Sequence, residues 1–564
     1  MQKRWKIKET DSQTVKDLAE SLGVSNSIAQ LLVLRGINTF DAAKQFFRPD
    51  FSQFHNPFLM KDMQKAVDRI QTAIENNEKI LVYGDYDVDG TTSVTMVYIF
   101  LSRLTENVAY YIPDRYTEGY GISLEGIDYA QENNFTLIIA LDCGIRAVNQ
   151  VNYANEKGVD FIICDHHNPS EVVPNSVAIL NPKQKDCNYP FKELSGCGVG
   201  FKLIQGYSEK NNITFEEIQS LFDLLVVSIS ADIVPMIDEN RVFSFFGLKQ
   251  INENPRVGIK ALMDAAKRKG KWTISDIVFG IAPRINAAGR IEHGKMAVEL
   301  LIEKDREKAV KLAEGIEELN KRRKCLDQDI TKQALGMIQK NKKSTVVYSP
   351  NWHKGVVGIA ASRLIEIHYK PTIVLAEKDG ELTGSARSVK DFDLYKALLQ
   401  CDKYLEKFGG HKYAAGLTLK KENLEDFIDA FERVVSNTIL DEQLTPEVSI
   451  DMELDLHDID DKLFRIIQQF SPFGPQNRNP IFITKAVKDS GYGGPVGADK
   501  THLRLNVKNE NSRNSISSIG FGLAHHFEKI KDGQSFDICY SIDENNWNGR
   551  KNLQLKLRDI KISI

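Results

Sequence analysis

Five short apolar runs alternate with helix-like segments between residues 79 and 181, and this alternation restricts the fold more than any other feature of the chain. The runs are KILVYG, ENVAYYIP, FTLIIALD, VDFIICD and SVAILN. Their lengths are typical of buried strands. Strands that alternate with helices predict a mainly parallel sheet with helices on both faces. The predicted fold class is therefore α/β, and ligands are expected at the carboxyl edge of the sheet.

Three aspartates, Asp85, Asp87 and Asp89, follow the first run at alternating positions, and the apolar segment 91–101 after them predicts a helix. Carboxylates this close raise each other's pKa unless a cation compensates. A hard divalent cation such as Mg²⁺ or Mn²⁺ suits such oxygen ligands. An EF-hand loop is excluded, because its twelfth position needs a Glu and holds Met96 here. A turn that merely favours Asp and Gly is the simpler alternative.

Other acidic residues follow later runs in the same way. Asp142 follows LIIAL, the triplet Asp165, His166 and His167 follows FIIC, and Asp232 lies in LLVVSISADIVPM. Strand ends of one parallel sheet converge on one cleft, so we expect these side chains to meet the first three aspartates. Each residue taken singly has a simpler alternative: an aspartate at such a position could cap the next helix, and a histidine could pair with a neighbouring carboxylate. Together, an oxygen-rich set with one or two imidazoles suits two Mn²⁺ or Mg²⁺ ions better than one zinc.

Two such cations about 4 Å apart favour phosphoryl chemistry, since one activates water while both stabilise charge on the phosphate oxygens. Hydrolysis of a phosphoester is the reaction that we predict. His167 then either protonates the leaving oxygen or holds the scissile phosphate. The residue types leave both roles open, and they give His353 no role.

The remaining segments predict further domains. Residues 305–343 lack proline and carry helical apolar spacing, so they predict a long linker helix. A smaller α/β unit with STVVYS and PTIVLAE follows, and the last segment contains short alternating strands typical of a β-barrel. The predicted domains are an N-terminal helical segment (1–60), the main α/β domain (61–304), the linker helix (305–343), a second α/β domain (344–445) and a β-rich domain (446–564).

Composition narrows the class of protein. Hydrophobic residues make up 42% and charged residues 27%, which is ordinary for a globular chain. The seven cysteines form no C-x-x-C pair, which argues against disulfides, zinc knuckles and iron–sulfur clusters. The amino terminus lacks a signal-peptide pattern and no segment has 18 uninterrupted apolar residues. We therefore expect a cytoplasmic protein without a membrane partner. The net charge of −4 gives no overall signal for nucleic acid, although residues 471–564 are locally basic, with 14 Lys and Arg against 9 Asp and Glu.

The motifs resemble a known family. GDYDVDGTT, LDCGI, the DHH triplet at 165–167 and ADIVPM resemble the DHH phosphoesterase superfamily, and GGHKYAAG at 409–416 is similar to the glycine-rich motif of its DHHA1 domain. PRINAAGR, GSARS and the β-rich end narrow the resemblance to the RecJ family of single-stranded-DNA-specific exonucleases. The resemblance runs from about residue 30 to the end. It implies a DHH domain, a DHHA1 domain and a C-terminal OB-fold.

The resemblance also implies roles for individual residues. His167, with Asp142 and Asp165, would be catalytic, and His167 would contact the scissile phosphate. The metal ligands would be Asp85, Asp87, Asp89, Asp142, His166 and Asp232, with Asp142 and Asp232 as candidates to bridge two ions. Phosphate groups of the substrate would meet Arg115, Arg284, Ser385, Arg387, Gly409, Gly410 and His411. An arginine fork and closely packed glycines suit a phosphate. The alternatives are salt bridges for Arg284 and Arg387 and an ordinary turn for the glycines.

The implied function is metal-dependent hydrolysis of single-stranded DNA from 5′ to 3′, with release of 5′-mononucleotides in repair and recombination. A helicase and a single-strand-binding protein are candidate partners of a monomeric enzyme. One alternative is a DHH phosphodiesterase that acts on short oligoribonucleotides or cyclic dinucleotides. Another is a scaffold without activity, although the ligand set in this sequence is complete. The sequence leaves the physiological metal, the tolerance for RNA and the required overhang open.

Overall fold

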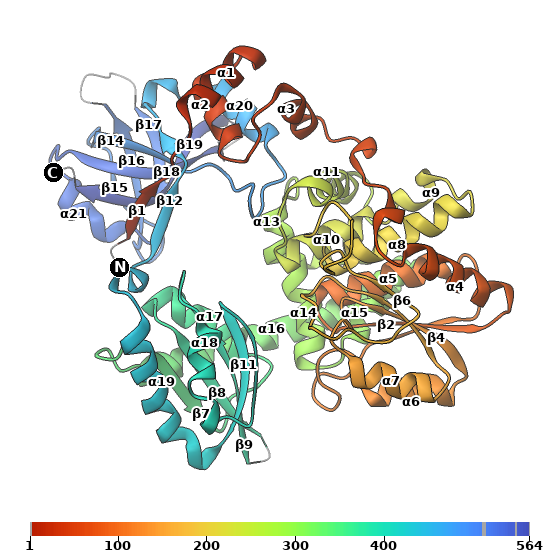
Figure 1. Ribbon diagram of the computed structural model, residues 1–564. Helices are drawn as coiled ribbons and strands as arrows, with labels where there is room; N and C mark the ends of the chain where they lie inside the picture. The colour runs from red at the N-terminus through yellow and green to blue at the C-terminus, as the bar shows by residue number, and fades with distance from the viewer. Residues whose placement is uncertain (1–2, 379, 510–514, 548–549, 563–564) are drawn as a thin grey trace.

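The computed structural model describes residues 3–378, 380–509, 515–547 and 550–562. In it the chain forms three bodies that lie at the corners of a triangle (Figure 1). Two are α/β domains joined by a long helix. The third is β-rich and contains segments from both ends of the chain.

The first α/β domain is built on a five-stranded sheet of order β3-β2-β4-β5-β6, in which every pair is parallel. Its strands are β2 (Lys79–Gly84), β3 (Val108–Tyr111), β4 (Phe135–Leu141), β5 (Asp160–Cys164) and β6 (Ala178–Leu180). Its helices are α4 (Met63–Glu75), α5 (Val88–Leu101), α6 (Leu124–Glu132), α7 (Val148–Glu156) and α8 (Gly196–Lys210). Leu141 is in register with both Gly84 and Cys164, so the strands end at one common edge.

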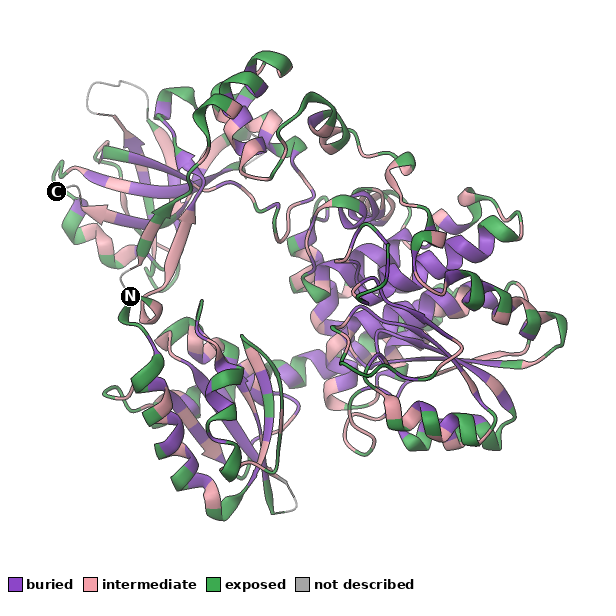
Figure 2. Cartoon of the chain, in the orientation of Figure 1, coloured by how far each residue is buried: buried purple, intermediate pink, exposed green. Residues whose placement is uncertain are grey.

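Both faces of this sheet are covered, as the continuous apolar runs predict. Ile80 and Val82 face the core formed with α4, α5 and α8, while Leu81 and Tyr83 face the core formed with α6 and α7. Figure 2 shows the central strands of this sheet mostly buried, whereas the edge strand β3 is intermediate along its length.

A helical layer extends this domain between residues 215 and 302. Its helices are α9 (Phe215–Gln219), α10 (Phe222–Asp232), α11 (Asp238–Glu253), α12 (Val257–Ala265), α13 (Ile274–Asp276), the π-helix η3 (Ile277–Ile281), α14 (Ala282–Ile291) and α15 (Lys295–Ile302). Residues 222–230 of α10 are all buried, because the helix is apolar on nearly every side and packs among α5, α8 and α11.

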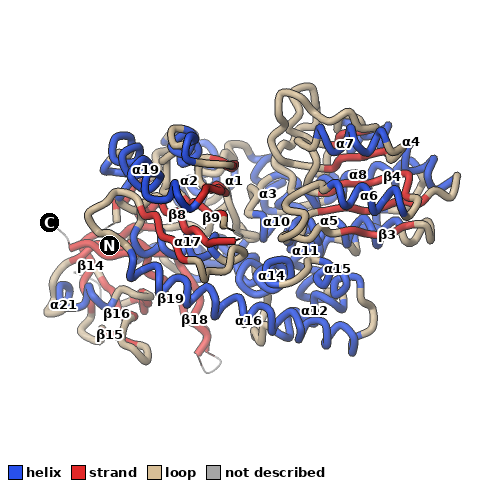
Figure 3. The backbone as a smooth tube through the Cα atoms, turned by 90° about the horizontal axis from the view of Figure 1, so that it is seen from below, coloured by secondary structure: helices blue, strands red, loops and turns tan. Residues whose placement is uncertain are grey.

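The linker is a single 32-residue helix, α16 (Arg306–Met337), which Figure 3 shows running from one α/β domain to the other. Asp305 caps it by accepting a hydrogen bond from the N–H of Lys308 (2.9 Å). Ala309 and Ala313 pack in the core of the first domain, and Ala334 packs in that of the second. The helix is therefore part of both domains.

The second α/β domain has a five-stranded sheet of order β10-β11-β9-β8-β7, in which only β7 and β8 run parallel. Its elements are β7 (Thr345–Ser349), α17 (Val357–His368), β8 (Thr372–Lys378), β9 (Glu381–Arg387), α18 (Leu394–Leu399), β10 (Lys407–His411), β11 (Ala414–Lys420) and α19 (Leu424–Thr438). The bend between β10 and β11 brings GGHKYAAG together as two adjacent strands.

The β-rich body is a barrel, because β14 pairs with both β18 and β16 and thereby closes the sheet. Its elements are β12 (Glu447–Ile450), β13 (Met452–Glu453), α20 (Asp461–Gln469), β14 (Phe482–Asp489), β15 (Gly494–Val496), β16 (His502–Lys508), β17 (Ile516–Gly520), α21 (Phe527–Ile530), β18 (Phe536–Trp547) and β19 (Arg550–Ile562).

The amino-terminal segment joins this barrel. Strand β1 (Arg4–Ile7) pairs in parallel with β12. Helices α1 (Ser12–Leu22), α2 (Asn26–Val33) and α3 (Phe40–Phe47) follow. Leu18 and Leu31 share one apolar core with Phe470 and Phe536. The segment therefore begins with a strand, which the helical expectation for residues 1–60 did not include, and it packs far from its neighbours in sequence.

The predicted fold class is confirmed: a mainly parallel α/β domain, a long helix, a smaller α/β domain and a terminal β-barrel. Among the described residues, no helix combines the length and the apolar character needed to cross a membrane.

Candidate metal centre and phosphate pocket

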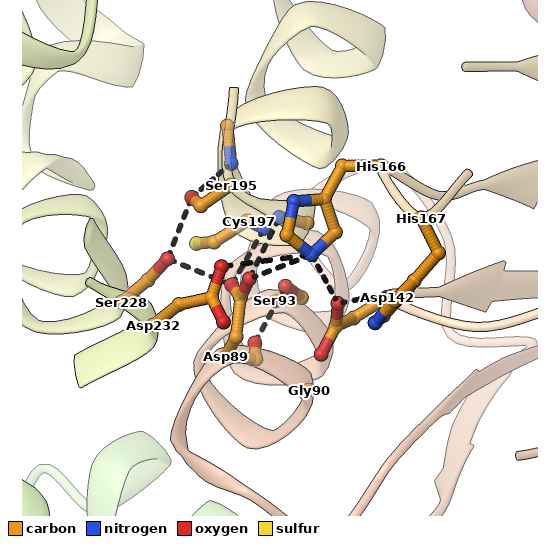
Figure 4. A network of polar contacts seen from close by, with 12 residues as sticks. Asp89, Gly90, Ser93, Asp142, His166, His167, Ser195, Cys197, Ser228 and Asp232 are labelled. Atoms are coloured by element: carbon orange, nitrogen blue, oxygen red, sulfur yellow. Dashed lines mark hydrogen bonds and ion pairs between the residues drawn. The ribbon is translucent and has the colours of Figure 1, made fainter. Parts of the chain in front are cut away.

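The predicted acidic residues meet at the carboxyl edge of the first sheet (Figure 4). Asp85 follows β2, Asp142 follows β4 and Asp165 follows β5. Asp232 is the last residue of α10. The N–H of Asp142 still donates to the carbonyl of Cys164 (2.9 Å), yet its φ of 59° lies in the left-handed region. That conformation is strained for a non-glycine residue, and such strain is frequent at functional sites.

Asp89 is held by fixed donors. Its carboxylate accepts hydrogen bonds from the N–H groups of Gly196 (2.7 Å) and Cys197 (2.8 Å) and from the hydroxyl of Ser228 (2.7 Å). These N–H groups open helix α8, whose positive end favours an ionised carboxylate. A Cβ at residue 196 would lie 2.6 Å from Cβ of Asp142, so only glycine lets the helix approach this closely. Sequence reasoning missed Ser228, since nothing local connects it to Asp89.

His166 presents one nitrogen to three carboxylates. Its Nδ1 lies 3.0 Å from the carbonyl oxygen of Leu194, which fixes the proton on that nitrogen. Its Nε2 lies 3.2 Å from Oδ1 of Asp142, 3.6 Å from Oδ2 of Asp232 and 3.8 Å from Oδ2 of Asp89. Burial lowers the pKa of His166. A neutral imidazole with a free Nε2 among carboxylates is the usual form of a metal ligand.

The donor set fits divalent cations. Asp89, His166 and Asp232 offer three ligand atoms within 4.8 Å of one another, and Asp142, His166 and His167 offer another three. Both carboxylate oxygens of Asp85 and Oδ1 of Asp142 are buried and have no hydrogen-bond partner among the described residues. Buried acceptors normally have one, and two overlapping groups of oxygen and nitrogen ligands suit two hard cations.

The pKa shifts of the clustered aspartates also favour a bound cation. Burial and the charges of neighbouring aspartates raise the pKa values of Asp85, Asp87, Asp142 and Asp232. Asp87 also caps α5 by accepting from the N–H of Gly90 (3.0 Å). Without cations these carboxylates resist ionisation, and cations at their centre would reverse that penalty.

Asp165 differs from the other aspartates, because hydrogen-bond donors surround its carboxylate. Its Oδ1 accepts from Nδ1 of His167 (2.7 Å) and from the N–H of His166 (2.7 Å), and its Oδ2 accepts from the N–H of Ile145 (2.9 Å). Although burial opposes ionisation, these bonds lower the pKa of Asp165 to about 2. Burial also opposes the charge on His167, but the bond to Asp165 raises the pKa of that imidazole. Asp165 therefore positions His167 and holds its proton.

Two cavities flank this cluster. One, of about 720 Å³, is lined by Asp165, His166, His167 and Asp232. On its opposite wall lie Gly410 and His411 of the second domain. The other cavity, of about 670 Å³, is lined by residues from both domains, namely Tyr86, Arg115, Arg290, Lys354, Ser385, Arg387, Gly409 and Gly416 among others. We call this second cavity the phosphate pocket. A larger cavity of about 910 Å³ lies elsewhere, between α3 and α11.

Three arginines line the phosphate pocket. The guanidinium carbon of Arg115 lies 4.6 Å from the ring centroid of Tyr86. In the sequence, Tyr86 stands between Asp85 and Asp87. Arg387 donates to the hydroxyl of Ser385 (2.7 Å), and Arg290 donates to the carbonyl of Gly355 (3.1 Å). Within the described part of the chain, none of the three arginines forms an ion pair with a carboxylate. Burial, followed by the charge of Arg115, lowers the pKa of Arg290 to about 10, so the group remains a cation at neutral pH.

The structure does not bring Arg284 into this pocket. Its Nε lies 2.7 Å from Oε2 of Glu317 on the linker helix, and its Nη1 donates to the carbonyl of Gly280. It thus forms the salt bridge that was the alternative reading. Arg290 occurs in the same PRINAAGR motif and takes the place in the pocket. Arg284 and Arg290 are six positions apart on one helix, so their side chains lie on different faces of it. The motif alone does not indicate which of these faces is functional.

The glycines of GGHKYAAG lie in paired strands rather than in a turn, with Gly409 opposite Gly416 and Gly410 opposite Ala415. A Cβ at Gly410 would lie 2.3 Å from the carbonyl oxygen of Ala414, and its φ of 151° also favours glycine. Gly409 lines the phosphate pocket, while Gly410 and His411 line the other cavity. The strand therefore borders both cavities.

Comparison with known proteins gives three domain matches: DHH family, N-terminal domain (residues 79–229), DHHA1 domain (327–437) and RecJ OB domain (450–559). The single-stranded-DNA-specific exonuclease RecJ of Bacillus subtilis is 38% identical over 567 residues, which cover 99% of this chain and 71% of the relative. The protein of the same name from Escherichia coli is 31% identical over 527 residues, 89% of this chain and 90% of the relative.

Solved structures agree with these matches. The crystal structure of Thermus thermophilus RecJ in complex with Mn²⁺ has a TM-score of 0.85 at 25% identity and covers 100% of this chain and 80% of that chain. Its structure with Mg²⁺ has a TM-score of 0.79 at 23% identity, with coverages of 100% and 79%. The likeness extends over all three bodies of the fold.

Proposed function

This chain belongs to the RecJ family of single-stranded-DNA-specific exonucleases, and on that premise we propose that it removes nucleotides successively from the 5′ end of single-stranded DNA. The products would be 5′-mononucleotides. The observation that carries the proposal is the group of three arginines beside the aspartate cluster, which have no carboxylate partner among the residues that the structure describes.

Mn²⁺ or Mg²⁺ is the cofactor, since the structures of the Thermus relative contain these cations and the donor set of this chain fits them. We propose two ions, held by Asp87, Asp89, Asp142, His166 and Asp232, with Asp85 beside them. When bound, such a pair supplies activation of water and stabilisation of the charge on the phosphate.

The protein's own groups would position the substrate. His167 keeps its proton because of Asp165, and its imidazole lines the cavity beside the cluster. We propose that it donates a hydrogen bond to an oxygen of the scissile phosphate. Tyr120, whose hydroxyl lies 3.4 Å from Nε2 of His167, limits the direction of that donor.

The polarity follows from the phosphate pocket. Arg115 and Arg290 come from the first domain, and Ser385 and Arg387 come from the second, so a dianion between them would meet donors on both sides. A terminal phosphate is a dianion, whereas an internal phosphodiester carries one charge, and we propose that the group bound here is the 5′-phosphate. Its binding there would place the next phosphodiester at the aspartate cluster.

The barrel would bind the strand farther from the cut, as OB-folds do. This feature favours long single strands over the short oligonucleotides or cyclic dinucleotides of the alternative function. From the family we further propose a monomeric, cytoplasmic enzyme of DNA repair and recombination that receives strands from a helicase and a single-strand-binding protein. Light scattering during size-exclusion chromatography tests the monomer, and a dimer mass would contradict it.

Two labelled substrates test the polarity. The same single strand is labelled either at its 5′ or at its 3′ end and incubated with the protein and Mn²⁺. We expect early release of a labelled mononucleotide from the 5′-labelled strand alone. Early release from the 3′ end would refute the assignment of the pocket, and internal fragments at the start would refute exonucleolytic cleavage.

A further inference from the structure

The loop after β3 connects the aspartate cluster to the second domain. It is ordered by its own hydrogen bonds: Oδ1 of Asp114 accepts from the N–H groups of Tyr116 (2.8 Å) and Thr117 (2.9 Å), and Glu118 accepts from the N–H of Asp114 (2.7 Å). A loop held in this way fixes the two side chains at its tip. Arg115 extends over Tyr86, whereas Tyr116 extends toward the second domain.

Tyr116 contacts the turn that precedes α17. Its hydroxyl donates to the carbonyl of Arg290, and its ring centroid lies 4.6 Å from Nζ of Lys354. The ring also packs edge to face against His353, at 6.0 Å between centroids. Arg290 then donates from its guanidinium to the carbonyl of Gly355 (3.1 Å). Two residues of the first domain thus bind three successive residues of the second.

Gly355 is required by this close approach. A Cβ there would lie 2.5 Å from the hydroxyl of Tyr116 and 2.6 Å from the carbonyl oxygen of Arg290. Its φ is not in the left-handed region, so space alone demands glycine. Three residues farther along, a Cβ at Gly358 would lie 3.1 Å from Oγ of Ser385 and 3.2 Å from Nη2 of Arg387. The turn is therefore also a wall of the phosphate pocket.

We propose that Tyr116, Arg290 and Gly355 form a latch between the two α/β domains, and that Tyr116 is a positioning residue that sets selectivity for a 5′-phosphate. This inference rests on the terminal phosphate of the proposed function. The pocket needs Arg290 from one domain and Arg387 from the other, and the latch fixes the distance between them. Since coupling between two equilibria is reciprocal, a bound phosphate should also strengthen the latch.

Substitution Y116F removes the hydroxyl that bonds to Arg290 while keeping the ring against Lys354. Substitution G355A adds the Cβ that the latch excludes. The matched controls lie outside the latch. Y153F removes a hydroxyl that bonds to Asp128 (2.8 Å) in the same domain, and G336A adds a Cβ where no atom lies within 4 Å.

Binding is measured by fluorescence anisotropy in EDTA, so that the readout does not depend on the metal. One single strand with a 3′ fluorophore carries either a 5′-phosphate or a 5′-hydroxyl. We expect the unmodified protein to prefer the phosphorylated strand. Loss of one hydrogen bond should reduce that preference in Y116F by about three- to tenfold, G355A should reduce it further, and both controls should retain it. In steady-state cleavage with Mn²⁺, KM of Y116F for the phosphorylated strand should change more than kcat.

The outcomes separate the two proposals. Equal affinity of the unmodified protein for both strands would overturn the phosphate pocket of the proposed function. A clear preference that Y116F and G355A both keep would overturn the latch alone. An equal loss of affinity for both strands in Y116F would also overturn the latch as a source of selectivity, because it would indicate general damage to the fold.

Discussion

Replacing Asp142 with Asn, in protein freed of metal, should stabilise the first α/β domain even though it removes a proposed metal ligand. Oδ1 of Asp142 is buried and has no hydrogen-bond partner in the described part of the chain, and burial and the neighbouring aspartates raise the pKa of Asp142. Asparagine has nearly the same shape and no charge. The same substitution at Asp165 should have the opposite effect, since all its contacts favour the ionised carboxylate.

Both magnitudes follow from the geometry. One oxygen of Asp142 and one of Asp89 lie 3.2 and 3.8 Å from the same nitrogen of His166, so the two oxygens are at most about 7 Å apart. At an effective dielectric constant of 20, the repulsion between two ionised carboxylates at that distance is about 2 kcal/mol. Asparagine at residue 142 relieves it. For Asp165 the pKa of about 2 lies below the ordinary 3.8, a difference that corresponds to roughly 2 kcal/mol. Because this folded-state pKa is depressed, its contribution is complete above about pH 4 and is lost as the pH falls toward 2.

The assay is thermal unfolding at neutral pH in EDTA, followed by circular dichroism. We expect the apparent midpoint to rise by a few degrees for D142N and to fall by a few degrees for D165N. Only directions are compared, since a chain of three bodies does not unfold in two states. Added Mn²⁺ should then raise the midpoint of the unmodified protein but not that of D142N, because ligand binding stabilises only a competent site.

The reasoning fails if D142N lowers the metal-free midpoint as much as D165N does. That result would mean that the carboxylate of Asp142 is satisfied without a cation, and the structural argument for the metal centre would be lost. Nuclease activity should be absent from D142N in either case, so stability and not activity decides the question.

Three further predictions concern the pocket, the helix start and the barrel. R290A should abolish the preference for a 5′-phosphate in anisotropy measurements, whereas R284A should retain that preference and lower the thermal midpoint. Loss of the preference in R284A but not in R290A would contradict the assignment of Arg290 to the pocket. G196A should reduce kcat about 100-fold with Mn²⁺ while circular dichroism shows a folded chain, because its Cβ displaces the aspartate after β4. Activity near that of the unmodified protein would contradict the close approach. A chain without residues 446–564 should aggregate, because helices α1–α3 lose the core that they share with the barrel. Removal of residues 1–48 as well should restore solubility in a sedimentation assay, and equal solubility of the two truncated chains would refute the shared core.

The convergence of the aspartates was predictable because it obeys a rule of topology. Asp85, Asp142 and Asp165 each follow an apolar run, and parallel strands must end at one edge. Their division of labour was not predictable in that way. Asp165 bonds to His167 and to backbone N–H groups, and one of these, the N–H of Ile145, reaches it only when the loop after β4 folds against it. The prediction that Asp165 acts in catalysis stays a proposal, through His167.

The phosphate pocket was harder to predict, because its arginines come from separate domains. Ser385 and Arg387 alternate along β9 and therefore share a face, which the motif indicated. Arg284 and Arg290 occur on one helix and differ only in the neighbours that each side chain meets. Glu317, which binds Arg284, lies 33 positions farther along the chain. No local pattern reports a partner at that distance.

The joining of the two ends of the chain has a consequence during synthesis. Residues 4–47 are translated before the segment on which they pack, because β12, which pairs with β1, begins at Glu447. At about 5–20 residues per second, the roughly 400 intervening residues take about 20–80 s to translate. For that time α1 and α2 can contact each other but lack the barrel and α20, on which their apolar faces also pack, while the α/β domains can already fold. Until the barrel has been translated, the amino-terminal segment would therefore benefit from protection by chaperones.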